Sequence, residues 1–217
     1  MASIFEKNPD NKIYYSPTPG HVTIMAGMPN PPAGLVTDDL CKENYLRFAV
    51  FTALAYGAKG IQYLTFNMKR NDNNELFISS MLDRNGNKTA TFYYVKKINS
   101  EILKYQDIFL NVKIAKVTHV TEGVATWFLN KSIYFLLSLG AESILVSELT
   151  SNNKTYLMVV SKNVLRPQSF TLTVSSGEIK EITPLTSTKY DEKIYSAGSG
   201  ISRTIIPGGY RIFEFVS

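Results

Sequence analysis

The chain contains a single cysteine, Cys41, among its 217 residues. One thiol excludes an internal disulfide, so cysteine content does not identify the redox compartment. A catalytic thiol needs a basic partner, and the sequence offers only His21 and His119. Because Cys41 falls in the first turn of a predicted helix, we expect a structural role for it.

Long hydrophobic runs are also missing, which excludes a membrane-spanning helix of ~18 apolar residues. The longest apolar stretch, Phe48 to Tyr56, is interrupted by Thr52 and stops at Gly57. The hydrophobic content of 44% nevertheless supports a sizeable core and excludes a mostly disordered chain. The first ten residues lack a basic segment followed by an apolar one, so no signal peptide is expected. The localisation stays open, with a secreted or periplasmic parent protein as one interpretation.

The positive charge is not concentrated in one place. The net charge is +5, and the residues up to 111 hold 12 Lys and Arg against 10 Asp and Glu. The densest basic spots are the pairs Lys69-Arg70 and Lys96-Lys97. A nucleic-acid-binding protein usually gathers its excess on one face, so we expect a solvated surface and no nucleic-acid partner.

The first half of the chain, residues 1–111, has the pattern strand–helix–strand–helix. The two predicted strands are 21–28 and 60–66, and the predicted helices begin near Thr37 and Thr91. Apolar residues at helical spacing predict one buried face on each helix, and Gly57 is placed to end the first helix. The buried face of the first helix comprises Leu46, Ala49, Val50, Ala53 and Leu54, and that of the second comprises Tyr94, Val95, Ile98, Ile102, Tyr105 and Phe109. The charges Lys96, Lys97, Glu101 and Lys104 are expected on the solvated face.

The second half, residues 112–217, is predicted to be all-β. Short runs of β-branched and aromatic residues alternate with turn signals, which is typical of an antiparallel sandwich or open barrel. The predicted strands are 112–120, 124–129, 132–137, 143–149, 155–161, 169–174, 178–182, 202–206 and 210–216. Together with the first half, the fold class is α/β plus all-β, in two domains.

Residues 46–66, which read LRFAVFTALAYGAKGIQYLTF, carry a family resemblance. They resemble the end of the catalytic (β/α)8 barrel in glycoside-hydrolase-like proteins of gut bacteria, of the broad β-galactosidase type. The segment 82–89 is similar to a loop of that family, and 94–102 resembles its last barrel helix. The resemblance implies the last two βα units of a TIM barrel followed by a β-sandwich. A complete barrel needs ~250 residues, so the chain is expected to be a fragment or a shortened protein.

The same resemblance bears on catalysis. Retaining glycosidases use two carboxylates, and in this barrel family one of them ends strand seven. The strand-seven candidate, 21–28, contains no carboxylate, and the nearby Asp38 and Asp39 are more simply helix-capping residues. We therefore predict no catalytic residue in this chain and leave open whether it is an enzyme.

A sugar-binding role is predicted at the end of the strand 60–66. Tyr63, Thr65 and Asn67, with Lys69 beyond them, lie at or just past its carboxyl end, the edge where barrel enzymes build their sites. The competing interpretation is that Tyr63 and Thr65 are ordinary sheet residues and that Asn67 begins a turn. Trp127 is a second candidate for sugar stacking, with core packing as its alternative.

Neither a metal nor a cofactor is expected. The two histidines are far apart in sequence and lack a neighbouring acidic or cysteine cluster, and no glycine-rich phosphate loop occurs. Three functions remain: the C-terminal part of a glycoside hydrolase, a non-catalytic carbohydrate-binding module, or an assembly domain. The last would associate through the exposed edges of its incomplete barrel sheet.

Overall fold

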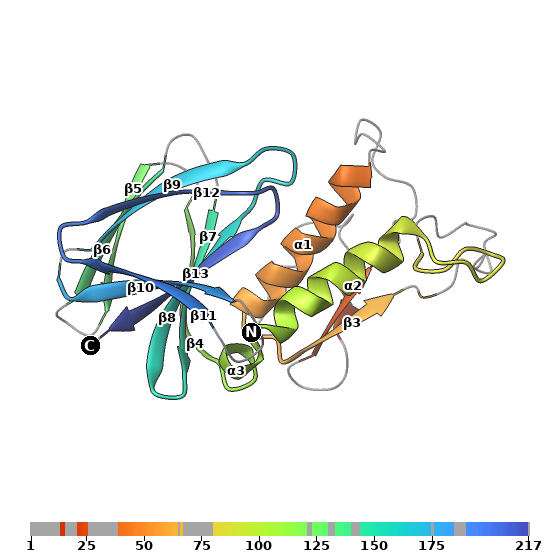
Figure 1. Ribbon diagram of the computed structural model, residues 1–217, viewed down its shortest axis with the longest axis horizontal. Coiled ribbons are helices and arrows are strands. Elements are labelled where there is room, and N and C mark those ends of the chain that lie inside the picture. The colour runs from red at the N-terminus through yellow and green to blue at the C-terminus, as the bar shows by residue number, and fades with distance from the viewer. Residues whose placement is uncertain are drawn as a thin grey trace.

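The computed structural model describes residues 14–15, 21–25, 39–64, 66, 80–120, 123–129, 133–139, 144–174, 176–184 and 190–216. Its layers are a four-stranded sheet, a six-stranded sheet, the helices and a small three-stranded sheet (Figure 1). Helix α1 (Asp39–Ala55) contacts both the small sheet and the six-stranded sheet. It therefore connects the two halves of the fold.

The small sheet contains the predicted parallel pair. Strands β2 (His21–Met25) and β3 (Gly60–Leu64) run parallel, with His21 opposite Gly60, and α1 connects them. Strand β1 (Tyr14–Tyr15), which the sequence pattern did not predict, adds antiparallel to β2. The βαβ connection is thus confirmed, whereas the closed (β/α)8 barrel stays a prediction.

Helix α1 buries the face predicted for it. Leu46, Ala49, Val50, Ala53 and Leu54 are all less than 9% exposed. The helix ends as expected at Gly57, whose φ of +82° is left-handed. The Gly57 amide donates to the Leu54 carbonyl and the Ala58 amide to the Ala53 carbonyl, a Schellman cap.

The second helix is shorter than predicted. Residues 91–110 were expected to form one helix, but α2 (Ala90–Leu103) and α3 (Gln106–Phe109) are separate. The chain leaves the helix at Tyr105, whose φ and ψ are −111° and 20°. Tyr105 is 5% exposed, so the break coincides with the burial of its large ring against the sandwich.

The second half of the chain forms the predicted antiparallel sandwich. The six-stranded sheet has the order β11-β10-β13-β8-β7-β4, and the four-stranded sheet has the order β12-β9-β6-β5. The bounds are β4 Lys113–Val120, β5 Gly123–Leu129, β6 Ile133–Leu139, β7 Ile144–Ser151, β8 Lys154–Ser161, β9 Gln168–Val174, β10 Glu178–Pro184, β11 Tyr190–Ser196, β12 Gly200–Ile205 and β13 Tyr210–Val216.

Strand β11 was missed because its sequence, YDEKIYS, is polar. It lies at the edge of the six-stranded sheet and pairs with β10 alone. Its residues 191–194 are exposed, and an edge strand of this kind needs little apolar content. Backbone pairing, rather than a buried face, defines this strand.

Two hydrophobic clusters hold the layers together. One lies between the two sheets of the sandwich and includes Phe170, Leu172 and Phe213. The other combines α1, α2 and α3 with the outer face of the six-stranded sheet, and it includes Phe51 and Met158. Because this second cluster draws on residues from both sides of position 111, the helices and the sandwich share one core.

A close backbone contact reinforces this junction. Gly208, between β12 and β13, has a φ of +64° and lies against α1. A Cβ atom at this position would come within 2.1 Å of the Asn44 carbonyl oxygen. The Ser147 hydroxyl of β7 donates to the Ala55 carbonyl at 2.6 Å, so the carboxyl end of α1 is also tied to the sandwich.

Candidate functional site

Tyr63 lies on the helix side of the small sheet. Its hydroxyl donates to the Asn99 side-chain oxygen of α2 at 2.8 Å. The ring packs against the core shared by the helices and the sandwich, and burial raises the pKa of the Tyr63 hydroxyl. The structure therefore gives this side chain a partner on α2, and its contact with a sugar stays a prediction.

The other predicted sugar contacts are outside the described residues. This applies to Thr65, Asn67 and Lys69 after β3. The helix-capping candidate Asp38, before α1, is also outside them. Trp127 lies on β5, an edge strand of the four-stranded sheet, and its side chain is likewise not described. Of the predicted sugar contacts, only Tyr63 therefore has its side chain in the described part of the chain.

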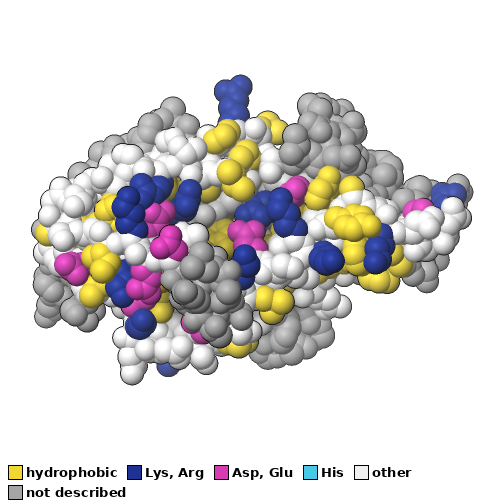
Figure 2. Space-filling view, viewed as in Figure 1, with side chains coloured by type: hydrophobic (Ala, Val, Ile, Leu, Met, Phe, Trp, Pro, Cys, Tyr) yellow, Lys and Arg dark blue, Asp and Glu magenta, His cyan; other side chains and the backbone are white. Residues whose placement is uncertain are grey.

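A different site appears where α2 meets the sandwich. A pocket of about 470 Å³ lies between this helix and strands β10 and β13. The helix side contributes Lys97, Ser100, Glu101, Lys104 and Tyr105, and the sheet side contributes Ile182, Thr183, Tyr210 and Arg211. We call it the junction pocket. Figure 2 shows basic and acidic side chains gathered over the middle of this face, between the sandwich and the helices.

A buried ion pair adjoins the junction pocket. The Arg47 guanidinium of α1 donates to both carboxylate oxygens of Glu101, with Nη1–Oε2 at 2.6 Å and Nη2–Oε1 at 3.0 Å. The Arg47 side chain is 5% exposed. Burial lowers the pKa of Arg47, but the bonds and charge of Glu101 outweigh it and leave the pKa raised. The negative charge of Glu101 is therefore compensated from within the fold.

Two tyrosines line the inner end of the pocket. The Tyr105 hydroxyl donates to the Ile182 carbonyl at 3.3 Å, and the Tyr105 and Tyr210 rings meet edge to face at 5.7 Å. Burial, followed by the charges of Tyr105 and Glu101, raises the pKa of Tyr210 well above its ordinary value. The Tyr210 hydroxyl is close to Tyr105, but it forms no well-aligned hydrogen bond with any residue that the structure describes.

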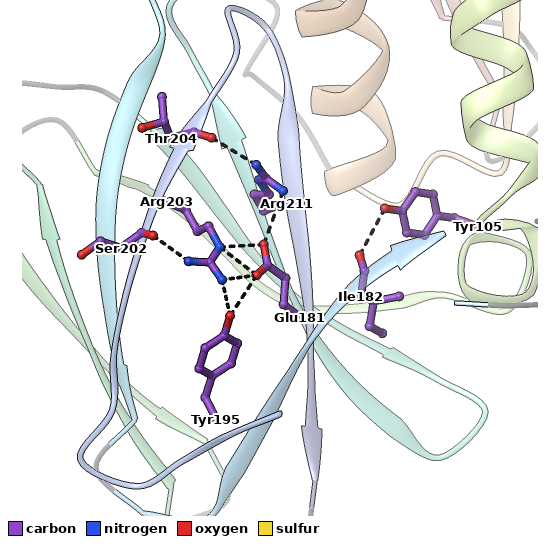
Figure 3. A network of polar contacts seen from close by, with 8 residues as sticks. All are labelled: Tyr105, Glu181, Ile182, Tyr195, Ser202, Arg203, Thr204 and Arg211. Carbon is purple, nitrogen blue, oxygen red and sulfur yellow. Dashed lines mark hydrogen bonds and ion pairs between the residues drawn. The ribbon is translucent and has the colours of Figure 1, made fainter. Parts of the chain in front are cut away.

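The sheet side of the pocket continues into a polar network. Arg203 of β12 holds the Glu181 carboxylate of β10 through Nε at 2.8 Å and 3.0 Å and through Nη2 at 2.5 Å (Figure 3). Arg211 approaches the same carboxylate at 3.4 Å, and Tyr195 contacts Arg203 through its hydroxyl. Because β10 and β12 belong to different sheets, this network bridges the sandwich. Arg203 and Arg211 therefore both interact with the carboxylate of Glu181.

Of the two histidines, His119 has an identifiable environment. Its Nε2 lies 2.7 Å from the Tyr56 hydroxyl, which joins β4 to the end of α1. Desolvation and the charge of Lys162 both lower the pKa of His119. His21 lies on β2, and its side chain is outside the described part.

The described residues contain no cluster of three or more His, Cys, Asp or Glu side chains able to hold a metal ion. Within the same ranges, no helix is both long and apolar enough to cross a membrane.

Sequence reasoning missed the junction pocket for two reasons. Glu101 and Lys104 were expected on a solvated face, but Glu101 is half-buried against Arg47. The other wall comes from β10 and β13, about 80 to 110 residues further along the chain. One signal was available: Arg47 interrupts the apolar stretch of α1 and so needed a buried partner.

No family model matches this chain, and the search of curated proteins finds no match. Among solved structures, the chain is similar to an alpha-amylase from Geobacillus thermoleovorans complexed with acarbose. That similarity has a TM-score of 0.43 at 10% identity, over 83% of this chain and 34% of the amylase. AmyP in complex with maltose gives a TM-score of 0.43 at 11% identity, over 82% and 35%. The chain spans about a third of each protein, and likeness at this level carries no argument about activity.

Proposed function

We propose that this chain is the C-terminal part of a glycoside-hydrolase-like protein and does not itself hydrolyse glycosides. In this proposal residues 1–111 are the last two βα units of a (β/α)8 barrel, and residues 112–217 are the sandwich that follows it. The observation that carries it is the parallel β2–α1–β3 unit, whose helix shares one core with an antiparallel sandwich. The finer assignment, to proteins of gut bacteria of β-galactosidase type, rests on the sequence of residues 46–66.

Sugar contacts are proposed at Tyr63, Thr65 and Asn67. Parallel strands of a barrel direct their carboxyl ends to the edge where substrates bind, and β3 ends at Leu64. The bond from Tyr63 to Asn99 would orient the strand end from the helix side. A carbohydrate is therefore the proposed ligand of the parent protein.

The proposal is tested by incubating the purified 217-residue chain with a panel of aryl glycosides. We expect no release of the aryl group above the buffer rate, because no catalytic carboxylate pair is assigned to this chain. Hydrolysis that survives further purification and follows the chain through size exclusion would overturn the proposal.

A second candidate is a non-catalytic carbohydrate-binding module, and the junction pocket favours it. Pockets of 300–1,000 Å³ with a few convergent polar groups are typical of small-molecule sites. Calorimetric titration with oligosaccharides tests this function.

The third candidate is assembly through β3, which is an edge strand of the small sheet among the strands that the structure describes. An unpaired strand edge is a template for another chain. Light scattering tests it, and a monomer at all concentrations counts against it.

A further inference from the structure

We propose that the junction pocket binds an acidic sugar, a hydroxylated ring of monosaccharide size that carries a carboxylate or sulfate group. The inference rests on the carbohydrate ligand of the proposed function. It does not require the chain to be part of a barrel enzyme. Three features of the pocket lead to it: its charge, the buried hydroxyl of Tyr210 and its size.

The charge around the pocket is positive after the ion pairs of the described residues are counted. Glu101 is paired with Arg47, and the carboxylate of Glu43 is paired with Lys97 at 2.6 Å. The Glu181 carboxylate is shared by Arg203 and Arg211.

Lys104 makes no side-chain ion pair with the residues that the structure describes. Two cationic groups of the lining, Lys104 and Arg211, therefore exceed the available carboxylates. A pocket with this excess attracts an anion.

Arg211 is well placed to hold such an anion. Its Nη1 is 3.4 Å from the Glu181 carboxylate, which is long for a hydrogen bond, and its Nη2 donates to the Thr204 carbonyl at 3.3 Å. Arg203 makes the short contacts with Glu181 instead. A ligand oxyanion can therefore compete for Arg211 without leaving Glu181 unpaired.

One buried polar atom of the lining points to a hydroxylated ligand rather than to a bare ion. Tyr210 Oη is enclosed beside Tyr105 and forms no well-aligned hydrogen bond with the residues that the structure describes. A buried hydroxyl is costly unless a partner is supplied, and a sugar hydroxyl can supply one.

The size of the pocket agrees with this class of ligand. A volume of about 470 Å³ exceeds what one oxyanion needs and suits a ring with its substituents. Ser100 and Thr183 add one hydroxyl group to each wall of the pocket. The pocket therefore offers cations for the acidic group and hydroxyls for the ring.

Lys104 also has a competing structural role, because it is the C-cap residue that follows α2. A cation at a helix carboxyl end interacts favourably with the helix dipole. That role predicts a change in stability and no change in ligand binding, so binding must be measured directly.

The test is isothermal titration calorimetry of the 217-residue chain with four ligands at low and high salt. The ligands are galacturonic acid, a galactose sulfate, galactose and inorganic sulfate. The variants are Lys104→Glu and its matched control Lys96→Glu, an exposed lysine of the same helix that does not line the pocket. Lys104→Gln replaces Lys104→Glu if circular dichroism shows that the latter does not fold.

We expect the acidic sugars to bind at least about tenfold more tightly than galactose, with the difference shrinking as salt screens the charges. Lys104→Glu should remove that preference, and Lys96→Glu should keep it. Equal affinity for galactose, tight binding of inorganic sulfate alone, or an unchanged preference in Lys104→Glu would each overturn the inference. Each of these outcomes leaves the hydrolysis test of the proposed function unaffected.

Discussion

Arg47 of α1 and Glu101 of α2 form a two-pronged ion pair beside the junction pocket, with bonds of 2.6 Å and 3.0 Å. The guanidinium also lies over the Phe51 ring, 5.0 Å from its centroid. Phe51 in turn packs on Tyr210 of β13, with ring centroids 4.0 Å apart. One arginine thus connects α1, α2 and the sandwich.

Removing the carboxylate of this pair should strongly destabilise the chain. Glu101→Ala leaves the Arg47 charge buried without compensation, and we expect a loss of about 3 kcal/mol in the free energy of unfolding. Urea denaturation followed by far-UV circular dichroism measures it. The matched control is Lys97→Ala on the same helix, which breaks the exposed pair with Glu43 and should cost less than about 1 kcal/mol.

A double variant separates charge burial from packing. Arg47→Met combined with Glu101→Leu removes both charges and keeps apolar volume, so it should recover most of the stability lost in Glu101→Ala. A double variant as unstable as Glu101→Ala would show that the guanidinium is needed for its contact with Phe51.

The docking of the β12–β13 turn on α1 should depend on Gly208. Gly208→Ala places a Cβ atom 2.1 Å from the Asn44 carbonyl oxygen, in addition to the strain of a left-handed φ. Gly198→Ala is the matched control, because its φ is +81° and nothing lies within 4 Å of its added Cβ. We expect about 1–2 kcal/mol of destabilisation at Gly198 from backbone strain alone, and clearly more at Gly208.

Thermal unfolding of the two glycine variants gives the comparison. Equal losses at both positions would mean that the turn moves away from α1 without cost. The contact between Gly208 and Asn44 would then not hold the helices to the sandwich.

Local pattern was sufficient for much of the fold. The apolar spacing of α1 identified its buried face, and Gly57 identified its end, because both depend on neighbouring residues. The break between α2 and α3 was not predicted. It coincides with the packing of Tyr105 against Tyr210, more than a hundred residues away, and hydrophobic periodicity carries no information about such a long-range contact.

The junction pocket was unpredictable for the same physical reason. Glu101 looks like a surface charge on a helix, and only its pairing with Arg47, 54 residues earlier, makes it part of a buried network. Strand β11 was missed because backbone pairing with β10 defines it, with charged side chains pointing to solvent. Hydrophobic patterning predicts buried apolar faces, but it does not predict interactions between polar groups that are far apart in the sequence.

Acidification should destabilise the chain through His119. Its pKa in the folded chain is lowered from 6.5, so the unfolded chain takes up a proton more readily. The stability contribution of neutral His119 is therefore complete above about pH 7 and decreases as pH falls through 6.5 toward the folded pKa. Nuclear magnetic resonance titration of the ring should give a pKa below 6.5.

Two variants test the cause of that pH dependence. Lys162→Ala removes a like charge and should move the pKa of His119 upward, although desolvation remains. His119→Asn should flatten the fall in unfolding temperature between about pH 7 and pH 5. An unchanged slope in His119→Asn would assign the effect to other groups.

Arg203 and Arg211, which both contact Glu181, should contribute differently to the stability of the chain. Arg203 makes the short bonds to this carboxylate, so Arg203→Leu leaves a group that is 7% exposed with only long contacts to Arg211 and Tyr195. We expect a loss of about 3 kcal/mol for Arg203→Leu and about 1 kcal/mol or less for Arg211→Leu. Chemical denaturation measures both.

The effects of the two arginine variants on ligand binding should have the opposite order to their effects on stability. Arg211 lines the junction pocket and Arg203 does not, so Arg211→Leu should abolish the preference for an acidic sugar while the chain stays folded. Arg203→Leu, measured at a temperature where it is folded, should retain that preference. An unchanged preference in Arg211→Leu would contradict the assignment of Arg211 to the ligand, and equal losses of stability would mean that the two arginines act as one structural unit.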